Sequence, residues 1–412
     1  MSAVLTSPPH PLGRPIVDAA FLANPYPTYQ ALREAGPIHW SEEFFGGAWL
    51  LTRHADVEGV LRDPRFAAQR TGGWVNQAAA ERGALAGFQQ LFARALLFLD
   101  APDHGRLRAL LQPAFRPEAL ARLRPQIERI ADELIDGLDH ADEFDFIARL
   151  ARPLPVRVIS AILGIEGADR AEVMAWSDDL AAFIGAPEPS QEQARRAQAS
   201  LLAMTRYFQA QLAAKRAAPG DDLLSELLKA RERGEIRDDA ELLAQCAMLL
   251  FAGHETTRNL LGNGLFALLS HPEQWAGLRQ DPAGGPGAVR ELLRYDSPVQ
   301  YTGRRVTTDL MLHGQRLRRG DLVLALIGSA NRDPARHALA EALDITRADP
   351  GALSFGSGVH VCLGAALTRL EAEVVLGRLL VRWPDLQLAS TQPQWCANPA
   401  YRGLAALPLR RA

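Results

Sequence analysis

Lysine and cysteine are both scarce in this chain of 412 residues. Lys215 and Lys229 are the only lysines, so 43 of the 45 basic residues are arginines. The three cysteines, Cys246, Cys362 and Cys396, are odd in number and too few for a disulfide framework. Such cysteine usage is typical of a reducing compartment, which predicts a cytoplasmic protein.

The chain also lacks a marked excess of charge and a long hydrophobic run. Its formal net charge is −3, which argues against a nucleic-acid partner. The most apolar run, Leu242–Gly253, is shorter than the roughly 20 residues of a membrane span, and charged residues flank it. The N-terminal sequence MSAVLTSPPHPLGRP has no basic region followed by an apolar one, so no signal peptide is expected. These absences predict a soluble protein without a membrane anchor.

Helical periodicity dominates the chain, whereas the strand-like pieces are short. The expected helices cover residues 103–115, 117–138, 153–163, 168–183, 191–217 and 363–382. The expected strands cover residues 37–40, 47–52, 310–312 and 322–326. This pattern predicts a fold that is mainly α with small β-sheets. Length alone allows two or three domains of about 100–200 residues. No repeat or convincing linker divides the chain, so we expect a single domain over residues 1–412.

One expected helix is unusually long, because residues 238–270 contain no proline. Its length of about 32 residues is far above the mean of roughly 11–12 for globular proteins. Apolar residues surround most of its middle, so the helix is expected to run through the interior. A polar cluster, His254-Glu255-Thr256-Thr257, interrupts that apolar middle.

A glycine-rich loop contains the most informative cysteine. Residues 355–364 read FGSGVHVCLG, in which the glycines allow a tight loop and a close approach to a flat ligand. Cys362 precedes a helix, where the helix dipole and free N–H groups favour a thiolate. No second ligand stands at zinc spacing, but a single thiolate can be the proximal ligand of a haem iron. A structural cysteine in a glycine loop is the alternative.

This loop resembles the F-G-x-G-x-H-x-C-x-G signature of the cytochrome P450 superfamily, and every specified position matches. The resemblance implies a haem-thiolate monooxygenase with the triangular helical prism fold of that superfamily. It implies haem b as the cofactor and Cys362 as the proximal ligand of its iron. Phe355, Gly356, His360 and Gly364 would then contact the haem.

The polar cluster of the long helix resembles the oxygen-binding motif of the same superfamily. Ala252 and Gly253 would leave room for dioxygen, Thr256 would hold the oxygen and an ordered water, and Glu255 would relay protons from solvent. The alternative is a satisfied polar kink, in which the threonine bonds to a carbonyl one turn earlier. For His254 we expect a structural hydrogen bond more than a place in the proton path.

Further residues match the architecture of the superfamily. Glu291 and Arg294 resemble the E-x-x-R motif, whose spacing places both side chains on one helix face. Arg347 matches the third member of the buried group that these two form in the family. We assign all three to folding and to the architecture of the haem pocket. The alternative for the pair is an ordinary solvated ion pair.

The two haem propionates require a basic cradle. His104 and Arg108 resemble the family residues that contact the propionates, and their i, i+4 spacing stacks them on one helix face. Arg304 matches the propionate-binding arginine that follows E-x-x-R, with Arg305 as the fallback, and His360 is the fourth member. The alternative for each is an exposed basic side chain.

Electrons are expected to come from separate proteins, because no flavin-type or iron–sulfur-type segment follows residue 412. The resemblance implies a ferredoxin and an NAD(P)H-dependent ferredoxin reductase. Ferredoxins are generally acidic, so arginines near the cysteine would attract them. Arg106, Arg116 and Arg122 are the docking candidates, although each can be an ordinary surface arginine. The acid–alcohol pair Glu255-Thr256 argues for dioxygen, since peroxide-driven relatives lack it.

The expected substrate is a hydrophobic organic molecule, which would undergo C–H hydroxylation or epoxidation in bacterial secondary metabolism or catabolism. The side chains expected to line its pocket are Trp74, Phe98, Met248, Phe251, Val299, Gln300 and Tyr401. A macrolide or other polyketide, a terpenoid, a fatty acid, an aromatic compound and a peptide all remain open. We expect a monomer. The alternative functions are a non-catalytic haem sensor and a helical interaction protein without a cofactor.

Overall fold

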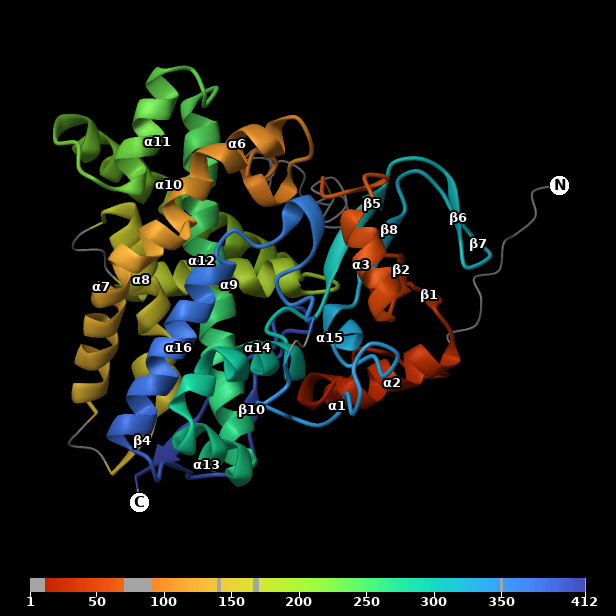
Figure 1. Cartoon of the computed structure of the whole chain (residues 1–412). Coiled ribbons are helices and arrows are strands. Elements are labelled where there is room, and N and C mark those ends of the chain that lie inside the picture. Colours follow the sequence, from red (N-terminus) through yellow and green to blue (C-terminus); the bar gives the residue numbers. More distant parts are fainter. Residues whose placement is uncertain (1–11, 70–90, 139–141, 166–169, 349–350, 412) are drawn as a thin grey trace.

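The computed structural model describes residues 12–69, 91–138, 142–165, 170–348 and 351–411. Its elements separate into a large helical group and a smaller group of short strands with the N-terminal helices (Figure 1). Trp74, one of the expected pocket residues, lies outside the described residues. In the described part of the chain, no helix is both long enough and apolar enough to cross a membrane.

Helices account for most of the described residues. The α-helices are α1 (Ala19–Ala23), α2 (Tyr26–Ala35), α3 (His54–Arg62), α6 (Asp103–Leu111), α7 (Pro117–Asp136), α8 (Pro153–Leu163), α9 (Arg170–Gly185), α10 (Gln191–Ala217), α11 (Leu223–Glu232), α12 (Asp239–Ser270), α13 (Pro272–Gln280), α14 (Gly285–Tyr295), α15 (Ile327–Ala330) and α16 (Ala365–Arg382). Short helical turns include η2 (Leu96–Phe98), η3 (Gln112–Phe115), η4 (Ile147–Ala151), η5 (Pro282–Gly284) and η6 (Gly358–His360). The helix expected over 103–115 is therefore α6 followed by η3.

Local signals explain why α12 is long and where it ends. The Asp238 carboxylate accepts a hydrogen bond from the Glu241 N–H at 2.8 Å, which caps the helix N-terminus. No proline interrupts the following 32 residues. The helix ends at Ser270, before His271 and the proline that begins α13. Most of its residues are buried, as expected for a helix that runs through the interior.

The strands form small sheets. They are β1 (Ile38–Ser41), β2 (Ala48–Leu51), β3 (Phe66–Ala67), β4 (Glu143–Asp145), β5 (Thr302–Val306), β6 (Leu310–Leu312), β7 (Gln315–Leu317), β8 (Leu322–Ala325), β9 (Gln387–Leu388), β10 (Gln394–Trp395), β11 (Leu404–Ala406) and β12 (Pro408–Arg410). The largest sheet has the order β1-β2-β8-β5-β3. Its β2–β8 pair is parallel with Trp49 opposite Val323, whereas β5 runs antiparallel to β8 with Arg304 opposite Val323.

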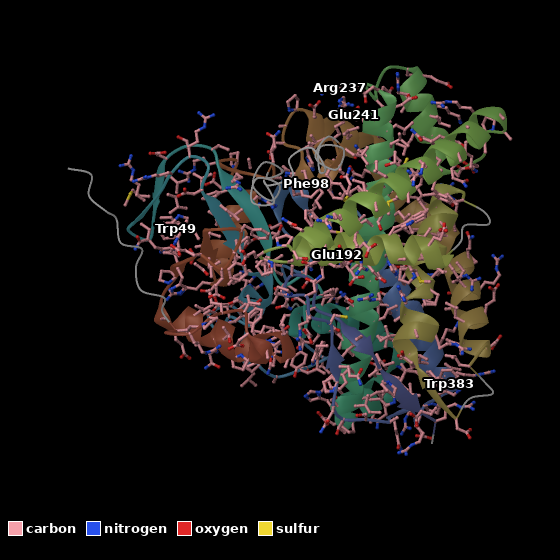
Figure 2. The ribbon with its side chains drawn as sticks, turned by 180° about the vertical axis from the view of Figure 1, so that it is seen from behind. Trp49, Phe98, Glu192, Arg237, Glu241 and Trp383 are labelled. Atoms are coloured by element: carbon pink, nitrogen blue, oxygen red, sulfur yellow. The ribbon has the colours of Figure 1, made fainter. Side chains whose placement is uncertain are left out.

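The hydrophobic core follows the same division. A large cluster surrounds α12 and extends from Phe98 to Trp383, which Figure 2 labels in different parts of the molecule. Trp383 packs there on Phe144, with 5.2 Å between the ring centroids. Two smaller clusters lie at the five-stranded sheet and the helices near it. The fold class expected from the sequence, mainly α with small β-sheets, is confirmed.

Candidate functional site

One cavity collects most of the expected site residues. Its volume is about 270 Å³. That is close to the lower end of the roughly 300–1,000 Å³ of an ordinary small-molecule pocket. The middle of α12 lines it together with the loop before α16, so Ala252, Gly253 and Thr256 share the cavity with Cys362.

The backbone of the cysteine loop has a shape that needs glycine. Gly356 and Gly358 have φ angles of 73° and 75°, which favour glycine. A Cβ at Gly358 would also lie 3.0 Å from the Leu61 carbonyl oxygen. The Cys362 N–H donates to the Phe355 carbonyl at 2.8 Å and closes the loop. Gly364 faces open space, which leaves room for a group beside the cysteine.

The Cys362 sulfur is open to the cavity but enclosed by protein atoms. Burial raises the pKa of the thiol, while the Gly364 N–H and the positive charges of Arg108 and Arg369 lower it. The helix α16 begins at Ala365, two residues later than expected, because Gly364 is its N-cap. These donors and charges would stabilise a thiolate that ligates a metal.

The four expected cradle residues, His104, Arg108, Arg304 and His360, all line this cavity. Arg304 is 5% exposed and donates only to the Gly303 carbonyl at 2.9 Å and the Thr302 hydroxyl at 3.4 Å. Burial lowers its pKa to about 10. Among the described residues, no carboxylate lies within 4.0 Å of its guanidinium. A buried cation without such a partner fits an anionic ligand group.

The two histidine rings of the cradle pack against each other at a tilt of 48°, with 4.0 Å between ring centroids. Burial, followed by the nearby His360, lowers the pKa of His104 to about 4. His360 Nε2 lies 3.7 Å from the Asp100 carboxylate. Although burial opposes its ionisation, the pKa of Asp100 falls to about 2 because His360 and the N–H groups of Ala68 and Gln69 bond to it. His104 is therefore a neutral hydrogen-bonding group at pH 7.

Thr256 lines the cavity, and its hydroxyl donates to the Ala252 carbonyl at 3.3 Å. The threonine–carbonyl hydrogen bond expected for a satisfied polar kink is thus present, but Thr256 also lines the cavity. Gly253 has a second role that the sequence did not suggest. A Cβ there would lie 3.3 Å from Ile159 of α8, so the glycine allows α8 and α12 to pack closely.

Glu255 is buried and does not line the cavity. Its Oε1 accepts from Arg258 at 2.7 Å and from Asn259 at 3.3 Å, while its Oε2 has no partner among the described residues. Burial raises its pKa, and Arg258 opposes that shift. Arg258 also pairs with Asp178 of α9 at 3.3 Å, and Arg152 pairs with the same carboxylate. Because Asp178 is partly exposed, this network joins the buried acid to the surface.

The side chain of His254 is fully buried, and neither ring nitrogen forms a hydrogen bond of ordinary geometry among the described residues. The expected structural hydrogen bond is represented only by a weak one with the main chain of Arg152. Burial, followed by the charge of Arg258, lowers its pKa to about 3. The imidazole is therefore neutral at pH 7.

Glu291, Arg294 and Arg347 come together as the sequence motif suggests. Arg294 donates to both carboxylate oxygens of Glu291, at 2.7 and 2.8 Å, and both residues are fully buried. Arg347 donates to the same carboxylate at 3.2 Å. The remaining donors of Arg294 bond to the carbonyls of Asn331, Ala340 and Ala342. The group thus holds the irregular segment before the cysteine loop against α14.

The expected pocket residues divide into two sets. Met248 and Val299 line the cavity, whereas four others lie outside its lining: Phe98, Phe251, Gln300 and Tyr401. Phe98 packs on Phe92, and Phe251 faces the ring of Tyr401. Gln300 follows Val299 in extended chain, so its side chain points the other way and donates to the Ser297 carbonyl at 2.7 Å.

Sequence reasoning missed several lining residues, of which Glu371 and Gln245 are the most polar. Glu371 is 2% exposed, and burial raises its pKa to about 8 against a hydrogen bond with Thr257. Among the described lining residues it carries the only carboxyl group. Gly364, Leu367 and Glu371 recur at helical spacing on α16, and this periodicity could have identified it.

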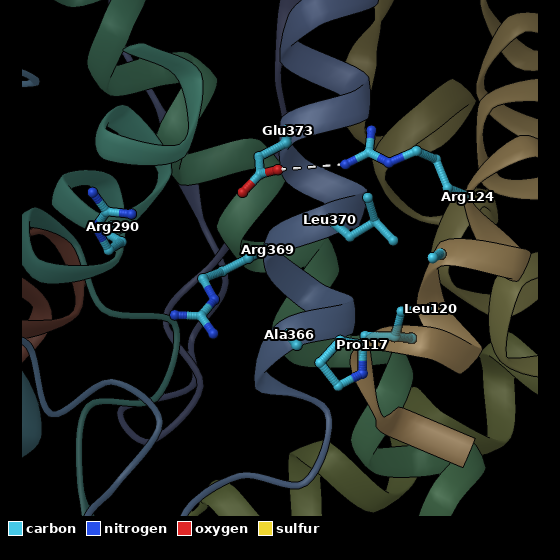
Figure 3. A pocket seen from close by; sticks show the side chains of 9 residues that line it. Pro117, Leu120, Arg124, Arg290, Ala366, Arg369, Leu370 and Glu373 are labelled. Carbon is cyan, nitrogen blue, oxygen red and sulfur yellow. Dashed lines mark ion pairs between the residues drawn. The ribbon is translucent and has the colours of Figure 1, made fainter. Parts of the chain in front are cut away.

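The expected docking arginines also divide. Arg106 donates to Glu241 at 2.6 Å, to Asp103 at 3.2 Å and to the Glu235 carbonyl, so it is an internal ion-pair residue. Arg116 and Arg122 are exposed. A groove near them lies between α7, α14 and α16, and its basic members are Arg124, Arg290 and Arg369 (Figure 3). Figure 3 shows Arg124 reaching Glu373 across the groove, at 3.8 Å.

The chain is similar to known proteins over most of its length. The cytochrome P450 family model matches residues 156–282 and 286–395. Cytochrome P450 107B1 of Saccharopolyspora erythraea is 41% identical over 95% of this chain and 96% of its own. The cytochrome P450 monooxygenase PikC of Streptomyces venezuelae is 39% identical over 95% of this chain and 92% of its own.

Solved structures are similar over nearly the whole length. The myxobacterial cytochrome P450 CYP267B1, in complex with myristic acid, superposes with a TM-score of 0.90 at 35% identity. The match covers 96% of this chain and 98% of that one. P450BioI in complex with an acyl carrier protein gives a TM-score of 0.88 at 34% identity, over 95% of this chain and 100% of that one. The chain therefore belongs to the cytochrome P450 family, and it is a cytochrome P450 monooxygenase.

Proposed function

We propose that this monooxygenase inserts one oxygen atom of O2 into a C–H or C=C bond of a hydrophobic substrate, with Thr256 and Glu255 as its catalytic residues. The observation that carries this proposal is the convergence of Cys362, Thr256 and the buried Arg304 on one cavity. Family membership implies a haem-thiolate cofactor, and its resident form would be haem b.

The residues present fit that cofactor. Cys362 would ligate the iron, and Arg304, Arg108 and His104 would hold the propionates. When bound, haem supplies the activation of dioxygen. Gly364 and Gly356 leave room beside the cysteine, and Phe355 contributes an apolar wall.

The chain itself would move the protons. Thr256 lines the cavity, and its hydroxyl proton, donated to the Ala252 carbonyl in this structure, would turn to bond with the oxygen that is being reduced. Glu255 would resupply protons to this region from the surface, through the network of Arg258, Asp178 and Arg152. Rotation of the Glu255 carboxyl from Arg258 towards Thr256 would carry the proton inwards.

The walls of the cavity support a hydrophobic substrate. The side chains away from the cradle are mostly aliphatic, namely Leu96, Leu97, Leu111, Ile159, Met248, Leu249, Val299 and Ile327. Two relatives are named for related chemistry: PksS of Bacillus subtilis for polyketide biosynthesis and an enzyme of Pseudonocardia autotrophica as a vitamin D(3) 25-hydroxylase. The walls support a hydrophobic substrate, and the names of these two relatives favour a polyketide or isoprenoid in secondary metabolism.

A separate ferredoxin, reduced by an NAD(P)H-dependent reductase, would supply the electrons. The basic groove of Figure 3, with Arg124, Arg290 and Arg369, forms a positive face beside the first turn of α16, and the exposed Arg116 directly precedes its lining residue Pro117. Arg122 is also exposed on α7 but does not line the groove. An acidic ferredoxin fits that face by charge. We further propose that the chain acts as a monomer and as one folding domain.

The deciding experiment is spectroscopic. The purified protein, reduced and exposed to carbon monoxide, should show the absorption band of a thiolate-ligated haem, and Cys362→Ser should abolish it. A colourless preparation would overturn the haem assignment. A haem protein that neither binds hydrophobic compounds with a low-to-high-spin shift nor consumes O2 with reduced ferredoxin would support the sensor alternative. A panel of polyketides, terpenoids, fatty acids and aromatic compounds would identify the substrate class.

A further inference from the structure

Gln245 lies on α12 and faces the cavity about two turns before Ala252. It is 1% exposed, and its carboxamide bonds only to main-chain groups. Its Oε1 accepts from the Leu96 N–H at 2.9 Å, and its Nε2 donates to the Arg94 carbonyl at 2.7 Å. The second proton of Nε2 bonds to the Glu241 carbonyl at 3.0 Å, so both donors are used.

These bonds join two parts of the cavity wall that are distant in sequence. The amide pairs with an N–H and a C=O of the 94–96 segment as a neighbouring peptide group would. The next side chains of that segment, Leu96 and Leu97, line the same cavity as the cysteine loop. Phe98 is buried behind them in the core.

The other links between this segment and the start of α12 are weaker. Arg94 pairs with Asp238 at 2.6 Å, but both side chains are more than 40% exposed. Exposed ion pairs contribute little, because solvent screens them. The hydrogen bonds of Gln245 are buried, and a buried N–H or C=O left unpaired is costly. Phe92, Ala95 and Phe98 also anchor the segment in the core. Among the hydrogen bonds and ion pairs that join it to the start of α12 in the described residues, those of Gln245 are therefore the ones best able to fix the Leu96–Leu97 wall.

We propose that Gln245 is a positioning residue that determines which substrates the cavity accepts, by clamping the main chain of residues 94–96 to α12. The inference rests on the proposed haem function, because the wall matters only for a molecule held in this cavity. Gln245 takes no part in proton transfer. Through Leu96 and Leu97 it determines the width of the cavity that Cys362 also lines.

Gln245→Met and Gln245→Glu test the clamp. Methionine has a similar length but forms no such bonds. Glutamate keeps the shape and one acceptor for the Leu96 N–H, but its second oxygen would replace Nε2 and repel the Arg94 and Glu241 carbonyls, which pushes the segment away. The matched control is Gln274→Met. Gln274 also accepts a main-chain bond, from the Ile345 N–H at 3.0 Å, but it belongs to α13 and does not line the cavity.

The first measurement is amide hydrogen exchange of residues 91–98, which requires no haem. We expect at least tenfold faster exchange at Leu96 in Gln245→Met and Gln245→Glu, with no change in Gln274→Met. Unchanged exchange in both Gln245 variants would overturn the clamp.

The second measurement is the spectral titration of the holoenzyme with azoles of increasing size. Imidazole should bind with the same Kd in the wild type and the variants, because it is too small to reach the wall. 4-Phenylimidazole and ketoconazole should change their Kd by tenfold or more in the Gln245 variants, and in a different ratio for each. Equal shifts for all three azoles, or none, would overturn the specificity role. If azoles cause no spectral change in the wild type, the haem proposal fails. The hydrogen-exchange result would still test whether Gln245 holds residues 94–96 in place.

Discussion

Glu255 and Arg258 lie one turn apart on α12, and Glu255 Oε1 accepts a hydrogen bond from Arg258 Nη2 at 2.7 Å. The second oxygen of the carboxylate has no partner among the described residues. The acid is therefore held on one side and free to bond on the other. Such an arrangement suits a group that turns between a surface network and the cavity.

Replacing Glu255 should slow oxygen-dependent turnover without weakening substrate binding. Glu255→Gln keeps the shape but removes the ionisable group, and positioned acid–base groups contribute about 10²–10⁴-fold to such steps. We expect a fall of that order in product formation with reduced ferredoxin, and a solvent isotope effect larger than that of the wild type. Glu226→Gln, at an exposed ion pair on α11, is the control. A turnover rate equal to that of the wild type would remove Glu255 from the mechanism.

Arg304 and its neighbour Arg305 should differ in their effect on haem retention. A hydrogen bond to a charged group contributes about 1.5–3 kcal/mol, which corresponds to about tenfold or more in affinity. Arg304→Ala should therefore lose haem at least tenfold faster to apomyoglobin. Arg305→Ala should behave like the wild type, because Arg305 donates to the Gly320 carbonyl and does not line the cavity. Equal loss rates for the two variants would contradict the assignment.

Glu371 should make the stability of the protein depend on pH. Burial raises the pKa of Glu371 to about 8 in the folded state, above its ordinary value of 4.5. Its contribution is fully present below about pH 4.5 and is lost as pH rises through about 8. The slope is at most about 1.4 kcal/mol per pH unit in that window.

Urea unfolding of the apoprotein between pH 5 and pH 9 would measure this slope. Glu371→Gln should flatten the pH profile and become more stable than the wild type towards pH 9. A profile of the same slope in both proteins would show that the carboxyl is already ionised at neutral pH. Glu226→Gln should leave the slope unchanged because its side chain is exposed.

The Glu291–Arg294 pair should be far more important for stability than surface pairs. Removing one partner of a buried, bonded pair costs about 3–5 kcal/mol. Arg294→Leu should therefore unfold at a much lower urea concentration and retain little haem. Lys229→Met, which breaks an exposed pair with Glu226, should cost less than about 1 kcal/mol. Similar midpoints for the two variants would contradict the structural role of Glu291 and Arg294.

The exposed arginines Arg116 and Arg122, at the start of α7, should control electron delivery. Reversing Arg116 and Arg122 to glutamate should slow reduction by ferredoxin on the order of tenfold at low salt, since charge steering raises association rates. The difference from the wild type should shrink as salt is added. Arg206→Glu, an exposed arginine on α10, is the control. Stopped-flow reduction under carbon monoxide measures the rates, and an effect equal to that of the control would exclude this face.

The sequence by itself could assign roles to residues that lie close together along the chain. The F-G-x-G-x-H-x-C-x-G loop, the cluster at Thr256 and the E-x-x-R pair each depend on short spacing, so their geometry follows from a turn or a helix. Helix and strand positions followed from periodicity and proline for the same reason. The expected haem-thiolate cofactor rested on these local patterns.

Only the tertiary structure decided which side chains face the cavity. Successive residues of β5 point to opposite sides, so Arg304 faces the cavity while Arg305 does not. Arg106 appeared available in the sequence, but Glu241 of a distant helix neutralises it. Phe251 lies next to Ala252 on α12 yet faces Tyr401, outside the cavity.

The same physical reason applies to Gln245, whose bonds to residues 94–96 no local pattern predicts. Local spacing determines how neighbouring residues lie on one element, and it therefore identified the thiolate loop. The packing of α6, α12, β5 and α16 against one another determines what surrounds that loop. This packing places Gln245, the buried carboxyl of Glu371 and the buried guanidinium of Arg304 around one cavity.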